Sequence, residues 1–230
     1  MTVPRLEDLD LSDFDFLDLG CSRGGSIRQC AKRFGASRGL GIDQDSDKVL
    51  EALDAGLDAA LGDATSLELD GQARFVSMMD FLEHLPSLEM VERTLASAAA
   101  AATDFVYVFH PSFEGEDYLG ELGLRQYWWH WKGHRCHPTV ADYCAILDRQ
   151  GLHDYMVRYL GPIHSSDHES IIPSTAPVDQ HSFDRQTHGP KPSIVFPRAI
   201  WRAQEIFIAL RPLPAGDWAR ITAPRDGGSD

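Results

Sequence analysis

The sequence has little positive charge and no long basic run. Its 230 residues carry 21 lysines and arginines against 35 aspartates and glutamates, which gives a net charge of −14. A protein that binds nucleic acid by neutralising phosphates needs a basic surface, and an anionic membrane makes the same demand. The charge balance therefore argues against nucleic acids and anionic membranes as partners.

Long apolar runs and paired cysteines are also missing. No apolar stretch reaches the length of a membrane span, since the alanine-rich stretch 96–102 is short and contains Ser97. We expect no secretory signal, because the first residues do not combine a charged and an apolar segment. No CxxC pair occurs, so we expect reduced thiols and a cytoplasmic location for the four cysteines, Cys21, Cys30, Cys136 and Cys144.

The composition that is present is typical of a globular protein. Apolar residues make up 43% of the chain and charged residues 24%, which is unlike a disordered sequence. The length favours one large domain. We expect a lead-in segment at 1–12, a single domain at 13–211 with insertions near 111–136 and 161–198, and a flexible polar tail at 212–230.

The stretch from Phe14 to Phe34 predicts a strand, a glycine-rich turn and a helix. An apolar run of strand length ends at Gly20, and the turn continues to Gly25. Apolar residues then recur at helical spacing up to Phe34, and Gly35 follows where a left-handed cap would lie. The first amides of such a helix have no partner within it, so the turn suits an anionic group such as a phosphate or a carboxylate.

Strands and helices continue to alternate after this unit. The expected strands are 14–19, 38–43, 57–61, 74–79 and 104–109, and the expected helices are 27–34, 46–55 and 87–102. This alternation predicts an α/β fold with a doubly wound, mostly parallel sheet and helices on both faces. Right-handed crossovers place the carboxyl ends of the strands on one edge, where ligands of such sheets bind.

The second half of the chain is less regular. Helix 139–150 and strand 153–160 are expected between two insertions, and 199–210 is interpreted as a strand because the sheet needs an edge partner. We expect a loop at 161–198, which is rich in proline, serine, aspartate and histidine. The aromatic run 127–131 predicts either a lid that stacks on an acceptor or a small satellite core.

Acidic residues follow four of the predicted strands and limit the choice of cofactor. Two cofactor classes suit a glycine turn with an acid after the second strand, namely dinucleotides and S-adenosylmethionine. The dinucleotide fingerprint G-x-G-x-x-G is broken here, because Ser22 occupies its middle position. A nicotinamide-dependent oxidoreductase also leaves the Gly62-Asp63-Ala64 segment unexplained.

Four segments in order resemble the class I S-adenosylmethionine-dependent methyltransferases. Residues 18–24, DLGCSRG, are similar to the family's D-x-G-x-G-x-G, with serine at the middle glycine. Asp43 ends the second strand, Gly62-Asp63-Ala64 follows the third, and 80–85, DFLEHL, resembles the E/D-V-L-E-H-V segment of the ubiquinone-biosynthesis type. The resemblance is firm over 14–109 and implies a Rossmann-like methyltransferase fold with seven strands.

The resemblance also implies roles for individual residues. The turn with Gly20, Ser22 and Gly24 would hold the methionine carboxylate, and Asp18 or Asp80 would favour the amino group or the sulfonium. Asp43 would accept the ribose hydroxyls. Asp63 and the Ala64 amide would hold the adenine. Each acid taken alone also fits a helix cap or a solvated loop residue.

Catalytic and metal-binding residues are less strongly indicated. A hydroxyl acceptor needs a general base, and His84 and then His110 are the candidates, although a packing role suits His84 better. His130, His134, Cys136 and His137 are ligand types, but their spacing is no standard zinc signature. We assign no metal and interpret this segment as a polar lid.

The sequence therefore predicts an S-adenosylmethionine-dependent methyltransferase that acts on a small molecule, with O- or N-methylation unresolved. Two alternatives are a non-catalytic protein that binds S-adenosylmethionine and a nicotinamide-dependent oxidoreductase. A nucleic-acid or protein methyltransferase is disfavoured, because DFLE stands at 80–83 where base-amine enzymes carry N/D-P-P-Y. We expect no nucleic-acid or membrane partner, and we also consider a homodimer, for which no motif argues.

Overall fold

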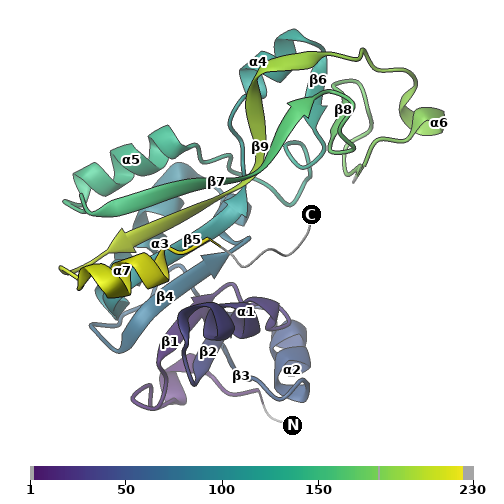
Figure 1. The fold of residues 1–230 in the computed structure, drawn as a ribbon. Helices are drawn as coiled ribbons and strands as arrows, with labels where there is room; N and C mark the ends of the chain where they lie inside the picture. The colour runs from purple at the N-terminus through teal and green to yellow at the C-terminus, as the bar shows by residue number, and fades with distance from the viewer. Residues whose placement is uncertain (1–2, 181, 225–230) are drawn as a thin grey trace.

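One seven-stranded sheet organises the computed structural model, which describes residues 3–180 and 182–224 (Figure 1). The strand order is β3-β2-β1-β4-β5-β9-β7. Strands β3 to β5 are parallel in this order, and β9 runs antiparallel to both β5 and β7. The strands are β1 (Phe16–Leu19), β2 (Gly39–Asp43), β3 (Asp58–Leu61), β4 (Ala73–Met79), β5 (Ala102–Pro111), β7 (Tyr155–Ser165) and β9 (Val195–Ala209). The predicted doubly wound, mostly parallel sheet is confirmed.

Helices cover both faces of this sheet. One apolar layer joins the sheet to α3 (Leu88–Ala101) and α5 (Val140–Arg149). A second layer, on the other face, joins it to α1 (Gly25–Phe34) and α7 (Ala215–Ile221). Helix α2 (Ser46–Asp54) packs against β3 through Val49 and Ala52. None of the described helices is both long enough and apolar enough to cross a membrane.

Aromatic residues fix the register of the central strands. Phe16, Phe75 and Phe105 are register partners on β1, β4 and β5, and their rings stack at centroid distances of 4.6 and 4.8 Å. Phe34 of α1 meets the Phe75 and Phe105 rings edge-on at 5.1 and 5.2 Å. Such pairs stabilise by about 0.5–1.5 kcal/mol each beyond the area they bury. The packing holds α1, and the turn before it, at a fixed place over the sheet.

The two insertions are one structural unit and not separate loops. Strands β7 and β9 extend beyond the sheet's core, and α4 (Glu116–Glu121), β6 (Leu124–Gln126), β8 (Ile171–Pro173) and α6 (Arg185–His188) gather around their far ends (Figure 1). We call residues 112–136 and 161–200 the cap. The expected loop at 161–198 is wrong in this respect, because β6 and β8 pair as a second sheet over an apolar cluster.

The tail also differs from the expectation. Helix α7 lies within the predicted flexible segment 212–230, and Ile221 packs in the same apolar layer as α1. Residues 225–230 of that segment lie outside the described residues, as do residues 1 and 2 of the lead-in.

The lead-in forms the short 3-10 helix η1 (Leu6–Asp8), and Arg5 bridges to Leu61 at the end of β3. The division into domains stays a prediction; one sheet running through residues 16–209 supports it.

Candidate functional site

The turn between β1 and α1 has left-handed backbone at three positions. The φ angles of Gly20, Ser22 and Gly24 are +71°, +49° and +82°. A Cβ on Gly20 would lie 2.4 Å from the Phe81 ring, so glycine is required there by conformation and by space. Ser22 is a non-glycine residue in a region that such residues adopt infrequently, and such positions concentrate at functional sites.

Asp18 lies beneath this turn and does not reach the surface. Its carboxylate accepts hydrogen bonds from the Ser26 hydroxyl on α1 and from Ser77 Oγ on β4, the latter at 2.6 Å. The side chain is 0% exposed, and burial raises the pKa of Asp18 to about 6. Asp18 therefore ties the turn to β4 and offers no exposed contact.

Asp43, at the end of β2, holds the turn from the other side. Its Oδ2 accepts the Ser22 amide at 2.8 Å, and its Oδ1 accepts the Asp45 amide at 3.0 Å. An ionised carboxylate offers about four acceptor positions, so two hydrogen bonds leave capacity for a pair of hydroxyls. This arrangement fits the ribose-binding role that the resemblance implies.

Asp63 and Ala64 follow β3 at the same edge of the sheet as Asp43. Asp43 is the register partner of Leu61, and its carbonyl accepts the Gly62 amide at 3.0 Å. Hydrogen bonds from Thr65 hold the pKa of Asp63 below its usual range. A cavity of about 640 Å³ lies beside Asp63. Its other wall comes from the lead-in segment, through Leu6 and Leu9.

Asp80 ends β4 in an unusual conformation. Its φ is +49°, its amide donates to the Phe109 carbonyl at 2.8 Å, and its side chain is exposed. The end of β4 thus turns sharply toward Phe81, whose ring packs against Gly20. The sequence-predicted cofactor residues are consequently gathered at the carboxyl edge of β1, β2, β3 and β4.

His110, at the end of β5, is completely buried and fully engaged. Its Nδ1 lies 2.7 Å from the Pro111 carbonyl, and its Nε2 lies 2.7 Å from the Tyr143 hydroxyl. Burial lowers the pKa of His110 to about 4. A general base must reach the proton that it removes, and His110 is 0% exposed. Its surroundings suit a positioning residue.

His84 lies in the short 3-10 helix η2 (Leu82–His84) beside two other ligand-type side chains. Among the described residues, one group of three side chains is placed to hold a metal ion: Glu83, His84 and His134. Of the histidine-rich segment, only His134 belongs to this group. His137 instead meets Glu116 at 3.2 Å, and Cys136 is a buried thiol whose pKa is raised by burial.

The aromatic run of the cap is mainly a satellite core. Trp128 and Trp129 are buried, and both indole nitrogens donate to the Ser112 carbonyl, at 3.0 and 3.2 Å. Trp131 is 37% exposed and lies over the histidines, 6.0 Å from the His84 ring and 4.8 Å from the His134 ring. Trp128 and Trp129 therefore belong to the satellite core, and the lid interpretation stays a prediction for Trp131.

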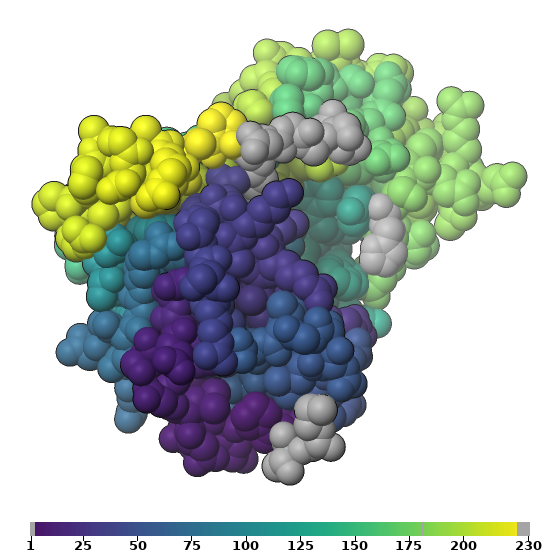
Figure 2. All heavy atoms as spheres, turned by 60° about the horizontal axis from the view of Figure 1, so that its bottom comes forward, coloured from purple at the N-terminus to yellow at the C-terminus, as the bar shows by residue number. Residues whose placement is uncertain are grey.

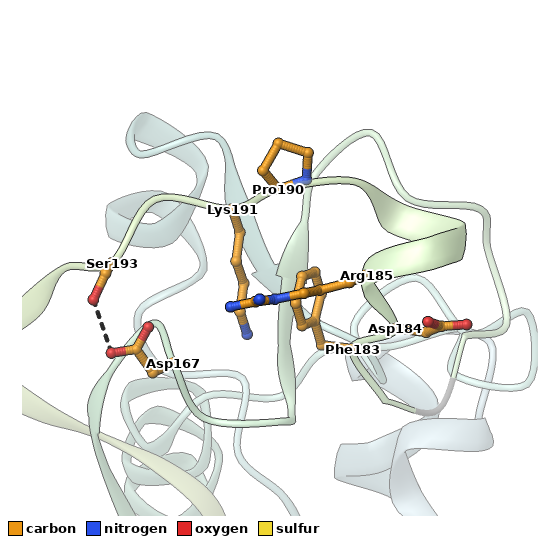
Figure 3. A pocket seen from close by; sticks show the side chains of 7 residues that line it. All are labelled: Asp167, Phe183, Asp184, Arg185, Pro190, Lys191 and Ser193. Atoms are coloured by element: carbon orange, nitrogen blue, oxygen red, sulfur yellow. Dashed lines mark hydrogen bonds between the residues drawn. The ribbon is translucent and has the colours of Figure 1, made fainter.

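A cavity of about 1050 Å³ lies elsewhere, in the outer cap around α6 (Figure 3). Phe183, Arg185 and Lys191 line it, and Asp167 on its rim accepts a hydrogen bond from Ser193 Oγ at 2.8 Å. No sequence-predicted site residue reaches it. In the space-filling view the cap, in green, lies at one side of the molecule, and the first half of the chain, in purple and blue, lies at the other (Figure 2). The motif residues favour the sheet edge as the functional site.

Three residues that lie at this site were not predicted from the sequence, namely Ser26, Ser77 and Glu83. Ser26 and Ser77 share Asp18, and no sequence pattern marks them. Glu83 stood within the recognised 80–85 segment but received no role. The signal that could have identified it is an acid set between Leu82 and Leu85 beside a histidine, although the sequence does not show that this glutamate is buried.

Comparison with known proteins agrees with this geometry. Residues 2–155 match a family model described as a methyltransferase domain. No curated protein sequence matches the chain.

Solved structures share the fold at low sequence identity. A SAM-dependent methyltransferase from Archaeoglobus fulgidus is 15% identical, with a TM-score of 0.57 over 84% of this chain and 85% of that one. Magnesium protoporphyrin IX methyltransferase from Synechocystis PCC 6803, with bound SAH, is 15% identical, with a TM-score of 0.52 over 89% and 77%. A putative methyltransferase of Haloferax volcanii, in complex with the activator Trm112, is 16% identical, with a TM-score of 0.53 over 91% and 85%.

Proposed function

Because this chain belongs to the family of methyltransferase domains, we propose that it transfers a methyl group from S-adenosylmethionine to a small-molecule acceptor. S-adenosylmethionine is the cofactor of this family. One observation carries the proposal: the glycine turn, Asp43 and Asp63 meet at one edge of the sheet. Ligands of open α/β sheets bind outside that edge.

The residues at this edge fit the parts of the cofactor. The turn before α1 offers backbone amides and the positive end of a helix dipole to a carboxylate. Asp43 has acceptor capacity left for two ribose hydroxyls. Asp63 lies beside a cavity of about 640 Å³ that adjoins the end of β2 through Gln44, where the adenine would lie. The buried charge of Asp18 favours a cation above the turn.

Methyl transfer asks the protein mainly to bind and orient. When bound, the cofactor supplies an activated methyl group on a sulfonium, which is displaced in line. The residues of this chain hold the two reactants in that alignment and exclude water. We propose that Asp43 and the turn fix the nucleoside, while the end of β4 and the cap form the acceptor side.

Neither His110 nor His84 is placed as an isolated histidine that could act alone as a general base. The buried His110 positions Tyr143 and the cap, and does not take the acceptor's proton. His84 Nδ1 lies 2.7 Å from the Gly133 carbonyl, and the residue forms a group of ligand-type side chains with Glu83 and His134. A hydroxyl acceptor would therefore meet a three-residue group, whereas an amine needs no such assistance once it is neutral.

Calorimetric titration with S-adenosylhomocysteine tests the cofactor site. We expect the wild-type chain to bind it and Asp43→Asn to bind at least about tenfold more weakly, because hydrogen bonds to a charged group contribute roughly 1.5–3 kcal/mol each. Asp45→Asn is the matched control: Asp45 lies two residues on and caps α2, and asparagine caps equally well. Equal binding by wild type and Asp43→Asn would remove the basis of the proposal.

Turnover must be measured separately. We expect S-adenosylmethionine to lose its methyl group to at least one member of a panel of small-molecule acceptors. Cofactor binding without transfer to any acceptor would favour the non-catalytic alternative. Uptake of a nicotinamide dinucleotide in place of S-adenosylhomocysteine would favour the oxidoreductase. The cytoplasmic location, the absence of nucleic-acid and membrane partners, and the homodimer stay predictions. Binding assays with RNA and DNA at low and high salt test the absence of a nucleic-acid partner. Sedimentation of the purified chain tests the homodimer.

A further inference from the structure

Glu83, His84 and His134 bring three ligand-type atoms together at the contact between the cap and the sheet. Their ligand atoms all lie within 4.8 Å of one another, and His134 Nε2 lies 3.9 Å from Glu83 Oε1. Two of these residues follow β4, and the third comes from the cap, 51 positions after Glu83 by residue number. Neither the predicted cofactor roles nor the apolar packing of the cap accounts for this meeting.

Glu83 is a buried acid without a hydrogen-bond partner. The residue is 0% exposed, and neither carboxylate oxygen has a hydrogen-bond partner among the described residues, although His134 Nε2 lies within ion-pair distance of Oε1. Leaving a polar group buried and unpaired costs roughly 1–3 kcal/mol, and more for a charged group. The amides of Arg135 and Cys136 do not pair with this carboxyl group, because they donate to the Glu83 backbone carbonyl, at 2.8 and 3.1 Å. The carboxylate therefore points to a missing positive partner.

The two histidines are oriented as metal ligands usually are. His84 Nδ1 lies 2.7 Å from the Gly133 carbonyl, and His134 Nδ1 lies 2.9 Å from the Trp128 carbonyl. A carbonyl only accepts, so each Nδ1 carries the hydrogen and each Nε2 keeps its lone pair. A backbone carbonyl on the other ring nitrogen is the common outer partner of a metal-binding histidine.

We propose that Glu83, His84 and His134 bind a divalent transition-metal ion, with zinc as the representative ion. Two imidazoles and one carboxylate are ligands that zinc accepts, whereas magnesium and calcium prefer oxygen alone. Ligand atoms about 2.1 Å from a tetrahedral zinc lie roughly 3.4 Å apart. The Glu83–His134 pair, at 3.9 Å, is close to this spacing, and the other two pairs, within 4.8 Å, must also close for an ion to bind.

The cap is built to hold this geometry. The two amides that bond the Glu83 carbonyl belong to the residues directly after His134, so the main chain clamps the histidine beside the acid. The Trp131 ring makes T-shaped contacts with both imidazoles. A bound ion would therefore join the cap to the sheet. His130 and His137 of the same segment take no part among the described contacts of this site.

Three protein ligands leave a coordination position open. The site adjoins the cofactor edge, because Phe81, two residues before Glu83, packs against Gly20. If the proposed methyl transfer holds, an acceptor hydroxyl at the open position would lose its proton to water more readily, and its oxygen would then attack the methyl carbon as the carbon–sulfur bond breaks toward sulfur. This part rests on the proposed function; the binding of the ion does not.

Cobalt(II) titration of the full chain, stripped of metal with a chelator, tests the site directly. We expect one equivalent to bind with a visible ligand-field spectrum, and zinc to displace it. Glu83→Gln and His134→Gln should each weaken binding by at least about a hundredfold, since even outer-shell changes cost 10–100-fold. His137→Gln, three residues further along the same segment, should bind like wild type.

A thermal melt supplies a readout that does not depend on spectra. Glu83→Gln keeps the size of the side chain but loses the anionic ligand, so the metal-free variant should melt cooperatively, close to the metal-free wild type. Zinc should raise the melting temperature of wild type and of His137→Gln but not of Glu83→Gln. This result also shows that the variant folds.

The inference fails if wild type takes up no stoichiometric cobalt, or if Glu83→Gln and His134→Gln bind it as tightly as wild type. Titration with S-adenosylhomocysteine on the same samples separates the two proposals. Cofactor binding without cobalt uptake overturns the metal site alone, and cobalt uptake without cofactor binding overturns the methyltransferase proposal alone.

Discussion

Neutralising Asp18 should stabilise the protein, and only above acidic pH. Asp18 is 0% exposed, and burial raises its pKa from 3.8 to about 6 against the lowering effect of hydrogen bonds from Ser26 and Ser77. The folded state therefore holds a proton that the unfolded state releases between these two pH values. Stability that the protonated form provides is complete below about pH 4 and is lost as the pH rises through about 6.

The size of the effect follows from the shift. Each pKa unit corresponds to 1.36 kcal/mol, so a rise from 3.8 to about 6 amounts to about 3 kcal/mol. Asparagine has the shape of the neutral acid and can bond to both hydroxyls. We expect Asp18→Asn to match wild type near pH 4 and to exceed its unfolding free energy by up to about 3 kcal/mol at pH 8.

Urea unfolding at several pH values between 4 and 8 measures this difference. Asp15→Asn is the matched control, because a hydrogen bond from the Ser37 side chain holds the pKa of Asp15 below its usual value. Stability from Asp15 is present above its unfolded pKa and is lost toward acid, so this variant should be less stable than wild type at pH 8. The reasoning is refuted if the gap between Asp18→Asn and wild type is constant with pH, or if Asp18→Asn is the less stable protein at pH 8.

Three further substitutions probe the glycine turn, the hydrogen bond at the end of β5, and the buried ion pairs of β9. Gly20→Ala should abolish binding of S-adenosylhomocysteine in calorimetry, because φ is +71° and a Cβ would collide with an aromatic ring, whereas Gly25→Ala meets nothing within 4 Å and should bind normally. Tyr143→Phe should lower the unfolding free energy in urea by about 1–3 kcal/mol, because it removes a 2.7 Å hydrogen bond to His110. The midpoint of the pH–rate profile should stay unchanged, and a shifted midpoint would give His110 a catalytic role. Glu205→Gln should cost about 3–5 kcal/mol in urea unfolding, because a buried carboxylate that pairs with two arginines is neutralised, and an unchanged midpoint would contradict this.

Local patterns were sufficient to predict the part of the fold to which the cofactor site is assigned. Residues 14–35 form the expected strand, turn and helix, and Gly35 has the left-handed φ of +59° that its position as a cap predicts. The strand at 199–210 is confirmed as β9, although its composition equally suits a helix. The need for an edge partner decided it, which is an argument about the sheet and not about propensity.

The candidate site divides in the same way. Asp43 and Asp63 could be placed together from sequence, because parallel strands joined by right-handed crossovers put their carboxyl ends on one edge. The meeting of Glu83 with His134 could not, since it depends on how the cap folds back on the sheet. The cap in turn depends on Trp128, Trp129 and other apolar residues of both insertions forming one cluster.

The sequence alone thus determined the order of strands and helices up to β5 and the sheet edge at which the glycine turn and the acids lie, because period and turn chemistry act over a few residues. Only the tertiary structure decided that Asp18 is sealed beneath the turn, that His110 is closed off by Tyr143, and that α7 packs against α1's layer. Burial and hydrogen bonding depend on residues far apart in the chain, and a sequence pattern carries no record of those distances.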